Sequence, residues 1–125
     1  MSGITLDAGA LIAFERGNRL AVSVILRAVQ QRLPVVVPAG ALGQVWRDGR
    51  KQVRLVRLLG SDAVEIEALD DARARAAGQL CGVTRTTDVI DASVVLCART
   101  RGHAVLTSDP GDLQRLDPHL NMHSV

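Results

Sequence analysis

Two aspartates at the start of one apolar segment are the first candidates for catalytic chemistry. Asp88 and Asp91 begin a run of mainly aliphatic residues that ends with Arg99, Arg101 and Gly102. This pattern predicts a buried helix with a basic last turn and a glycine stop. Residues three positions apart share a helix face, so the two carboxylates are expected to lie together.

Two further aspartates follow short apolar segments that predict strands. Asp7 comes after residues 3–6, and Asp109 comes after residues 103–107. In open α/β sheets the carboxyl ends of the strands border the ligand crevice, so parallel neighbouring strands would bring these two acids to one edge. Asp112, one turn into the next predicted helix, is a candidate outer ligand. Clustered carboxylates repel each other, and such a site favours a hard cation such as Mg²⁺ or Mn²⁺.

Each acid also has a structural alternative. Aspartate favours the N-cap of a helix, and Asp7, Asp88 and Asp109 each precede a predicted helix. Asp91 lies within an apolar segment, where a carboxylate needs a cation, hydrogen bonds or an arginine such as Arg85. Independent caps do not explain why several acids fall at strand ends on one side of a sheet, so we favour a shared metal site. A phosphatase with an aspartate nucleophile fits less well, because no second acid lies two residues after Asp7.

The composition narrows the class of protein. A length of 125 residues predicts one domain over residues 1–125, and 47% hydrophobic residues with 2% aromatics predict an aliphatic core. The scarcity of aromatics argues against modules that stack bases, and a net charge of +2 does not by itself mark a nucleic-acid binder. Cys81 and Cys97 lack metal-ligand spacing. With no export signal and no long apolar run, the sequence predicts a cytoplasmic protein without a membrane segment.

The order of the predicted elements indicates the fold class. Strands are expected at 3–6, 35–37, 63–66, 103–107 and, at one edge, 120–123. Helices are expected at 8–14, 19–32, 39–46, 50–59, 69–80 and 88–101, and after 109. Short apolar strands alternating with helices predict a three-layer α/β/α sandwich with a central, mainly parallel sheet of four or five strands.

Three segments together match one family in order and spacing. They read LDAGALIAFERG at 6–17, VPAGALGQVWRDGRK at 37–51 and TDVIDASVVLCARTRGHAVLTSDPGDL at 87–113. On these segments the chain resembles the PIN domain and, within it, the VapC-like toxin ribonucleases of type II toxin–antitoxin systems. The resemblance implies a PIN-like fold, Mg²⁺- or Mn²⁺-dependent cleavage of RNA, neutralisation by a cognate antitoxin, and a homodimer.

The resemblance also assigns the candidate site. Asp7, Asp88 and Asp109 fall on three of the family's four acidic metal positions, and Gln44 stands where the family usually carries glutamate. An amide oxygen can bind a cation but brings no negative charge, so Mg²⁺ affinity should fall unless Asp91 compensates. These five residues form the expected catalytic set, with the four aspartates as metal ligands. The alternative is a PIN-fold binding protein whose catalysis is weakened or lost because of Gln44.

Residues around the acids are candidates for substrate binding. The Ser108 hydroxyl could position a phosphate or a water molecule, although it could equally serve a turn. Asp48, one turn beyond Gln44, is a second candidate to replace the missing charge. Five basic residues recur at helical spacing and would form a stripe for the RNA backbone, the antitoxin or the dimer partner, or simply a solvated face: Arg47, Arg50, Lys51, Arg54 and Arg57.

Overall fold

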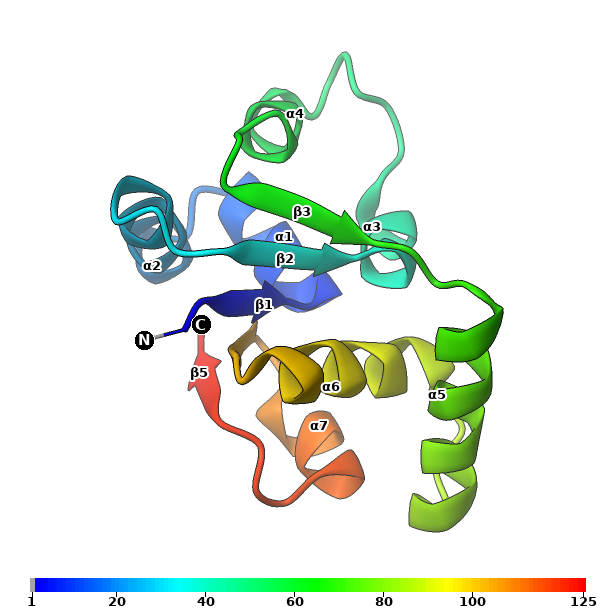
Figure 1. Ribbon diagram of the computed structural model, residues 1–125. Helices are drawn as coiled ribbons and strands as arrows, with labels where there is room; N and C mark the ends of the chain where they lie inside the picture. Colours follow the sequence, from blue (N-terminus) through cyan, green and yellow to red (C-terminus); the bar gives the residue numbers. More distant parts are fainter. Residues whose placement is uncertain (1) are drawn as a thin grey trace.

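The computed structural model describes residues 2–125, which build a five-stranded, all-parallel sheet (Figure 1). The strand order is β3-β2-β1-β4-β5. The strands are β1 Ile4–Leu6, β2 Val35–Pro38, β3 Val64–Glu67, β4 Ala104–Thr107 and β5 Met122–Ser124. The helices are α1 Ala8–Glu15, α2 Arg19–Gln30, α3 Ala39–Val45, α4 Val53–Leu59, α5 Asp71–Thr84, α6 Val89–Arg101 and α7 Pro110–Leu116. The predicted fold class is therefore confirmed, including the edge strand near the end of the chain.

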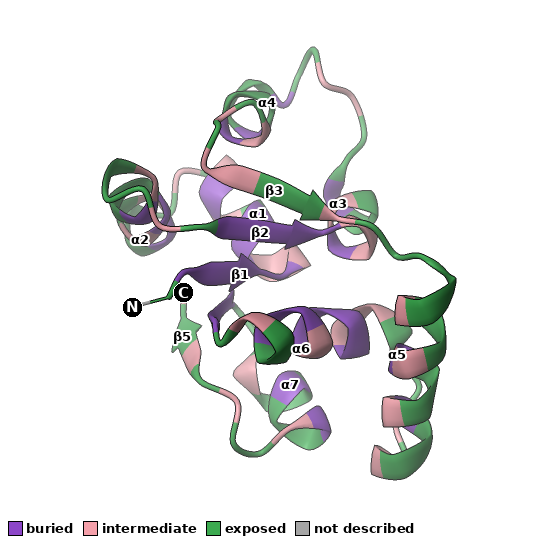
Figure 2. Cartoon of the chain, in the orientation of Figure 1, coloured by how far each residue is buried: buried purple, intermediate pink, exposed green. Residues whose placement is uncertain are grey.

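Helices cover both faces of the sheet because its central strands are apolar on both sides. Figure 2 shows the central strands β1 and β2 buried between the helix layers. On one face, Val35 and Val37 pack with side chains of α1, α2 and α4. On the other face, Val105 packs with α6 and α7, and α5 lies outside against α6. None of the helices within residues 2–125 combines the length and apolar character that a bilayer crossing needs.

The strand order places a topological switch between β1 and β4. From β1 the chain builds β2 and β3 on one side, and it later adds β4 and β5 on the other. Leu6 pairs with Leu106, and the backbone N–H of Asp7 donates to the carbonyl of Leu106 at 3.3 Å. Asp7 therefore lies beside Thr107 at the carboxyl edge, where open α/β sheets form their ligand crevices.

The connection between α3 and α4 differs from the predicted helix over 50–59. Residues 46–52 are not helical, and α4 begins only at Val53, so the five basic residues do not share one continuous helix face. The buried side chain of Gln52 holds this connection in place. Its Oε1 accepts from the backbone N–H groups of Arg47 and Asp48 at 2.8 and 3.0 Å, and its Nε2 donates to Glu15 and to the Val45 carbonyl.

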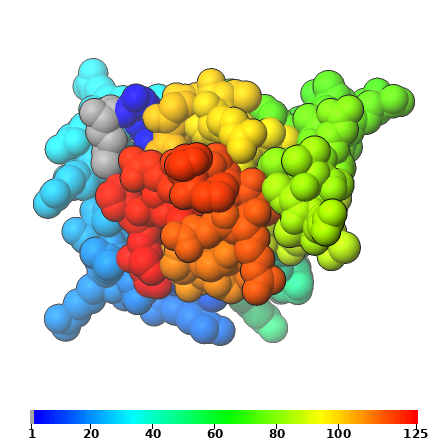
Figure 3. All heavy atoms as spheres, turned by 90° about the horizontal axis from the view of Figure 1, so that it is seen from below, coloured from blue at the N-terminus to red at the C-terminus, as the bar shows by residue number. Residues whose placement is uncertain are grey.

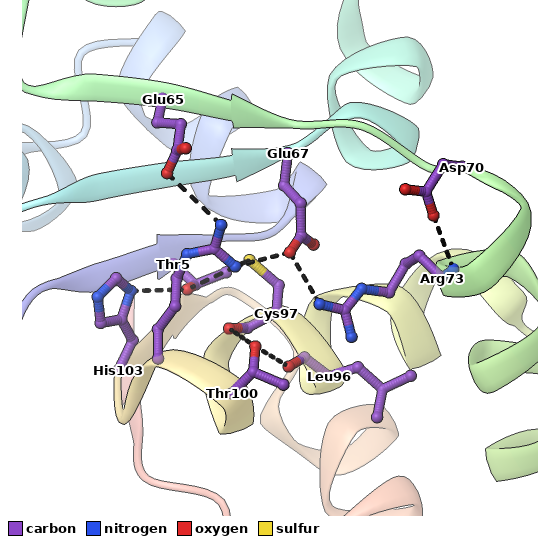
Figure 4. Close-up of polar contacts among 10 residues, drawn as sticks. Thr5, Glu65, Glu67, Asp70, Arg73, Leu96, Cys97, Thr100 and His103 are labelled. Carbon is purple, nitrogen blue, oxygen red and sulfur yellow. Dashed lines mark hydrogen bonds and ion pairs between the residues drawn. The ribbon is translucent and has the colours of Figure 1, made fainter.

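An ion network joins β3 to the helices on the α6 side of the sheet (Figure 4). Glu67 at the end of β3 pairs with Arg101 of α6 at 2.6 Å and with Arg73 of α5 at 2.9 Å. Only 19% of the Arg73 side chain is exposed, although its place on a surface helix would favour solvent. Asp70 caps α5, accepting from the Arg73 N–H at 2.8 Å. The network therefore ties the edge strand β3 to both α5 and α6.

Both cysteines are free and buried. Burial, together with the nearby Glu67 charge, raises the pKa of the Cys97 thiol to about 11, so this thiol is neutral at physiological pH. His103 is also buried, and its Nδ1 lies 3.1 Å from the Thr5 hydroxyl (Figure 4). These side chains therefore have structural roles.

Candidate active site

Asp7 is the most buried acid at the carboxyl edge of the sheet. Its side chain caps α1, because Oδ1 accepts from the backbone N–H of Ala10 at 2.8 Å. Burial raises the pKa of Asp7, and the charge of Asp109 adds to the rise, against hydrogen bonds from Thr107 and Ala10 that favour the ionised form. The cap foreseen as an alternative to metal binding is therefore present, but it engages one carboxylate oxygen and leaves the side chain beside Asp109.

Thr107 links the two neighbouring strand ends. Its buried hydroxyl forms a hydrogen bond with the Asp7 carboxylate and accepts from the backbone N–H of Asp109 at 2.9 Å. Asp109 precedes α7 without capping it through its side chain. A hydrogen bond with Asp109 and the charge of Asp109 raise the pKa of Asp112. The structure thus brings Asp112, which the sequence marked only as an outer candidate, into the same acidic group.

The first turn of α6 supplies two more carboxylates. Asp88 caps the helix, with Oδ1 accepting from the backbone N–H of Asp91 at 2.9 Å. Asp91 is half-buried, and its pKa is raised to about 6, first by burial and then by the charges of Asp88, Asp7, Asp112 and Asp109. The Arg85 alternative fails, since no ion pair joins Arg85 to Asp91 within residues 2–125. The charges of Asp88, Asp7, Asp112 and Asp109 therefore all act on Asp91, which places the five carboxylates in one neighbourhood.

The raised pKa of Asp91 predicts a specific dependence of stability on pH. An acid whose folded-state pKa lies above its unfolded value of 3.8 makes the fold less stable as pH rises from about 4 through about 6. Asp91→Asn should remove this loss and stabilise the protein at pH 7 by about 1 kcal/mol, a value reduced for solvent screening of a half-buried group. Thermal melts at pH 4.5 and pH 7 measure the effect. The exposed turn variant Asp62→Asn is the control, and equal pH profiles of wild type and Asp91→Asn would contradict the expectation.

The donor chemistry of this group fits a divalent cation, since carboxylate oxygens are the ligands that Mg²⁺ and Mn²⁺ prefer. Among residues 2–125, however, no three His, Cys, Asp or Glu side chains stand in an arrangement that could already hold a metal ion. The caps give one reason, because one oxygen each of Asp7 and Asp88 is turned onto a backbone N–H. The group is therefore an acidic cluster rather than a preformed metal cage.

Gln44 does not share the groove that is lined by Asp88, Asp91 and Asp112. It lies near the end of α3 and lines another groove with Ile12 of α1 and Lys51. Asp48, the second candidate for the missing charge, lines that same groove and is engaged by Arg50. The negative charge that Gln44 does not supply is therefore provided within the acidic cluster by Asp91 and Asp112.

The basic residues chosen for RNA contact have diverse surroundings. The Arg47 guanidinium donates to the Trp46 carbonyl at 2.6 Å and to the Gly43 carbonyl at 3.4 Å, which satisfies the end of α3. Arg50 lies 3.6 Å from Asp48 with 94% of its side chain exposed. Lys51 is exposed and lines the groove with Gln44. These residues do not form the helical stripe that their spacing predicts.

Ser108 lies against the first turn of α1, where Gly9 leaves room for it. A Cβ at position 9 would collide with the Ser108 hydroxyl and would also crowd its Cβ and backbone nitrogen. The exposed Ser108 thus packs directly beside the helix that Asp7 caps and precedes Asp109 in the chain. The glycine fixes the approach of β4 to the start of α1.

This close approach predicts the effect of a small substitution. Gly9→Ala should displace the 107–109 turn and lower any cleavage activity about tenfold, since small misplacements at a catalytic centre are costly. Helix propensity alone would favour alanine by about 1 kcal/mol. Gly9→Ala combined with Ser108→Gly relieves the collision and should cleave at the rate of Ser108→Gly alone, whereas Gly78→Ala, at a helical glycine with open space around it, should cleave at the wild-type rate. Initial cleavage rates measure all four variants, and an unchanged rate in Gly9→Ala would refute the inference.

The groove beside Asp88 and Asp91 is also lined by residues that the sequence motifs do not mark as candidate site residues. Thr87 and Arg85, between α5 and α6, and Arg115 on α7 line it together with the acids, and it encloses about 520 Å³. In the sequence, the only sign of this groove is the polar run of residues 84–87. That Arg115 of α7 lies beside this run follows from the fold and cannot be read from the sequence.

Comparison with known proteins adds evidence on the fold. No family model matches the chain, and no curated protein matches its sequence. The chain is similar to one in the crystal structure of VapBC2 from Rickettsia felis bound to a DNA fragment from their promoter, with a TM-score of 0.73 and 12% identity over 97% of each chain. It is also similar to a chain in the structure of FitAB bound to IR36 DNA fragment, with a TM-score of 0.68 and 16% identity over 97% of this chain and 94% of that one. At these identities the likeness is one of fold, and the chain therefore has the PIN-like fold that its three ordered motifs predict.

Proposed function

We propose that this protein is a VapC-like toxin, a divalent-metal-dependent endoribonuclease that a cognate antitoxin neutralises. The observation that carries the proposal is the position of the half-buried Asp91, which lies within reach of the charges of four other carboxylates at the switch point of a PIN-like sheet. Bringing five carboxylates together destabilises the fold through charge repulsion. A bound cation would offset that repulsion, so such a cluster is typical of a functional site. The ordered motifs and the fold shared with VapBC2 and FitAB add support. The proposal includes RNA as substrate, a homodimer and a cytoplasmic location.

The four predicted ligands Asp7, Asp88, Asp91 and Asp109 would hold Mg²⁺ or Mn²⁺. The ion would lower the pKa of a bound water and stabilise negative charge on the scissile phosphate. Thr107 orients Asp7 and the Asp109 backbone through one hydroxyl, which restricts their relative movement. All four carboxylates must be ionised for this role.

The test is cleavage of RNA by the purified protein with Mg²⁺, with Mn²⁺ and with EDTA. We expect metal-dependent cleavage of internal phosphodiester bonds that is lost in EDTA and restored by added metal. Cleavage that persists in EDTA, or none under any condition with the wild-type fold intact, would overturn the proposed activity.

A second candidate function is a PIN-fold binding protein with little or no catalysis. The observations that favour it are Gln44 in place of the usual acid and the lack, within residues 2–125, of a preformed group of three metal ligands. Under the main proposal, wild type is active, and Gln44→Glu should change its rate by less than about threefold, because Asp91 already supplies a compensating charge near the other acids. A large gain from an inactive wild type would instead favour the second candidate. Cleavage rates of the two proteins, measured side by side, separate them.

A further inference from the structure

A groove beside the acidic cluster is lined from two elements that are far apart in the sequence. Residues 84–88, between α5 and α6, contribute one part, and Asp112, Arg115 and Leu116 of α7 contribute the other. Figure 3 shows α7 in orange next to the end of α5 in yellow-green on this face of the molecule. The groove continues to Asp91, so a ligand held in it lies beside the candidate active site.

The two arginines in the groove are free to bind an external anion. Arg85 and Arg115 are both exposed, and neither forms an ion pair within residues 2–125. Arg85 also ends α5 in the left-handed conformation, with φ 57°, a position that glycine or asparagine would occupy at lower cost.

The threonine hydroxyls of this groove are not equivalent. Thr84 donates to the Leu80 carbonyl at 2.8 Å, so the 3.1 Å contact between the Thr84 and Thr86 hydroxyls uses the hydrogen of Thr86. Thr87 has no side-chain hydrogen bond to any residue of the described chain 2–125. Its hydroxyl hydrogen is therefore the one that remains available beside the two guanidinium groups.

The two guanidinium groups and the Thr87 hydroxyl together favour the phosphodiester backbone of a nucleic acid as the ligand of this groove. We propose that Arg85, Arg115 and Thr87 bind a backbone phosphate of the RNA strand next to the position that is cleaved. The inference rests on the proposed function for the identity of the strand, while the contacts themselves need no metal. Phosphate oxygens match guanidinium and hydroxyl donors. The carboxylates of Asp88, Asp91 and Asp112 line the same groove and repel an anion, so the two guanidinium groups must outweigh this repulsion where the phosphate binds.

Binding without metal tests the contacts separately from cleavage. The experiment follows fluorescence anisotropy of a short, labelled oligouridine in EDTA, for wild type and for Arg85→Gln with Arg115→Gln. The double variant should raise the Kd about tenfold and reduce the salt dependence by about 0.7 units of log K per log salt, as expected for one lost phosphate contact on a single strand. Arg19→Gln with Arg27→Gln removes the same charge from exposed positions of α2 and should raise the Kd less than about twofold.

The hydroxyl is tested by a matched pair of substitutions. Thr87→Val should weaken oligouridine binding about threefold, and Thr87→Ser should bind as wild type does, because serine keeps the donor. A groove variant that binds like the α2 control overturns the inference, as does a loss confined to an oligoglutamate probe, which would indicate an acidic protein partner. If the protein cleaves no RNA but the groove variants still lose binding, the phosphate site stands and the nuclease proposal fails. If the protein cleaves RNA but the groove variants bind oligouridine as wild type does, the nuclease proposal stands and the phosphate site fails.

Discussion

Asp7→Asn is expected to lower metal-dependent RNA cleavage by at least about 100-fold, the scale of losing one key charge-stabilising group at a catalytic centre. Asparagine is isosteric with aspartate, and its oxygen can still accept from the Ala10 N–H, so α1 keeps its cap. The substitution also removes a buried charge whose pKa is raised, so the fold should not lose stability. Single-turnover cleavage rates and a thermal melt measure the two effects.

The chain offers a closely matched control for this variant. Asp70 caps α5 with the same geometry, as its Oδ1 accepts from an N–H three residues on at 2.8 Å, but it lies outside the acidic cluster. Asp70→Asn should leave the cleavage rate unchanged. Asp109→Asn, at a side chain that caps nothing, should reproduce the loss seen for Asp7→Asn. If Asp7→Asn and Asp109→Asn both cleave at the wild-type rate, the acids are only structural.

Glu67→Ala is expected to have the largest effect on stability, about 3 kcal/mol, because it leaves two partly buried arginines without their shared partner. The Glu67 side chain is 14% exposed, and it contacts Arg101 at 2.6 Å and Arg73 at 2.9 Å. These groups tie β3 to α6 and α5, so their loss should loosen the edge of the sheet. Urea unfolding gives the free-energy difference.

A neighbouring acid on the same strand provides the comparison. Glu65 pairs with Arg101 at 3.5 Å, but its side chain is 66% exposed, so Glu65→Ala should cost less than about 1 kcal/mol. The pH dependence gives an independent check. Because two arginines lower the pKa of Glu67 against the effect of burial, its contribution is present above 4.5, the unfolded value, and is lost as pH falls through the lower folded-state pKa. Equal costs for the two variants would show that the network is not centred on Glu67.

Features set by local pattern were predictable from the sequence. The strand ends at Asp7 and Asp109 follow from short apolar runs, and their proximity follows from the rule that parallel strands end at one edge. The cap at Asp70 follows from residue type and position. In each case the residue's neighbours along the chain, together with a general rule for parallel sheets, were sufficient.

Features that depend on contacts between distant elements were not predictable. Residues 50–52 have no helix breaker, yet α4 starts later because the buried Gln52 amide bonds to the turn before it and to Glu15 of α1. Arg73 looks solvated by periodicity, but its partner Glu67 lies on a strand. Arg85 and Arg115 line the same groove only because α5 and α7 lie next to each other in the folded protein, which the sequence does not reveal.

The two helix caps at the site have a consequence for how this protein could change over evolution. Capping needs an oxygen acceptor and not a negative charge, so asparagine at Asp7 or Asp88 would preserve the helices. At Asp7 the charge even opposes folding, as its raised pKa shows. A single nucleotide change from an aspartate to an asparagine codon would therefore remove a charge that the proposed metal site needs without unfolding the protein. The proposed cleavage and the stability of the fold are thus separable at these two positions.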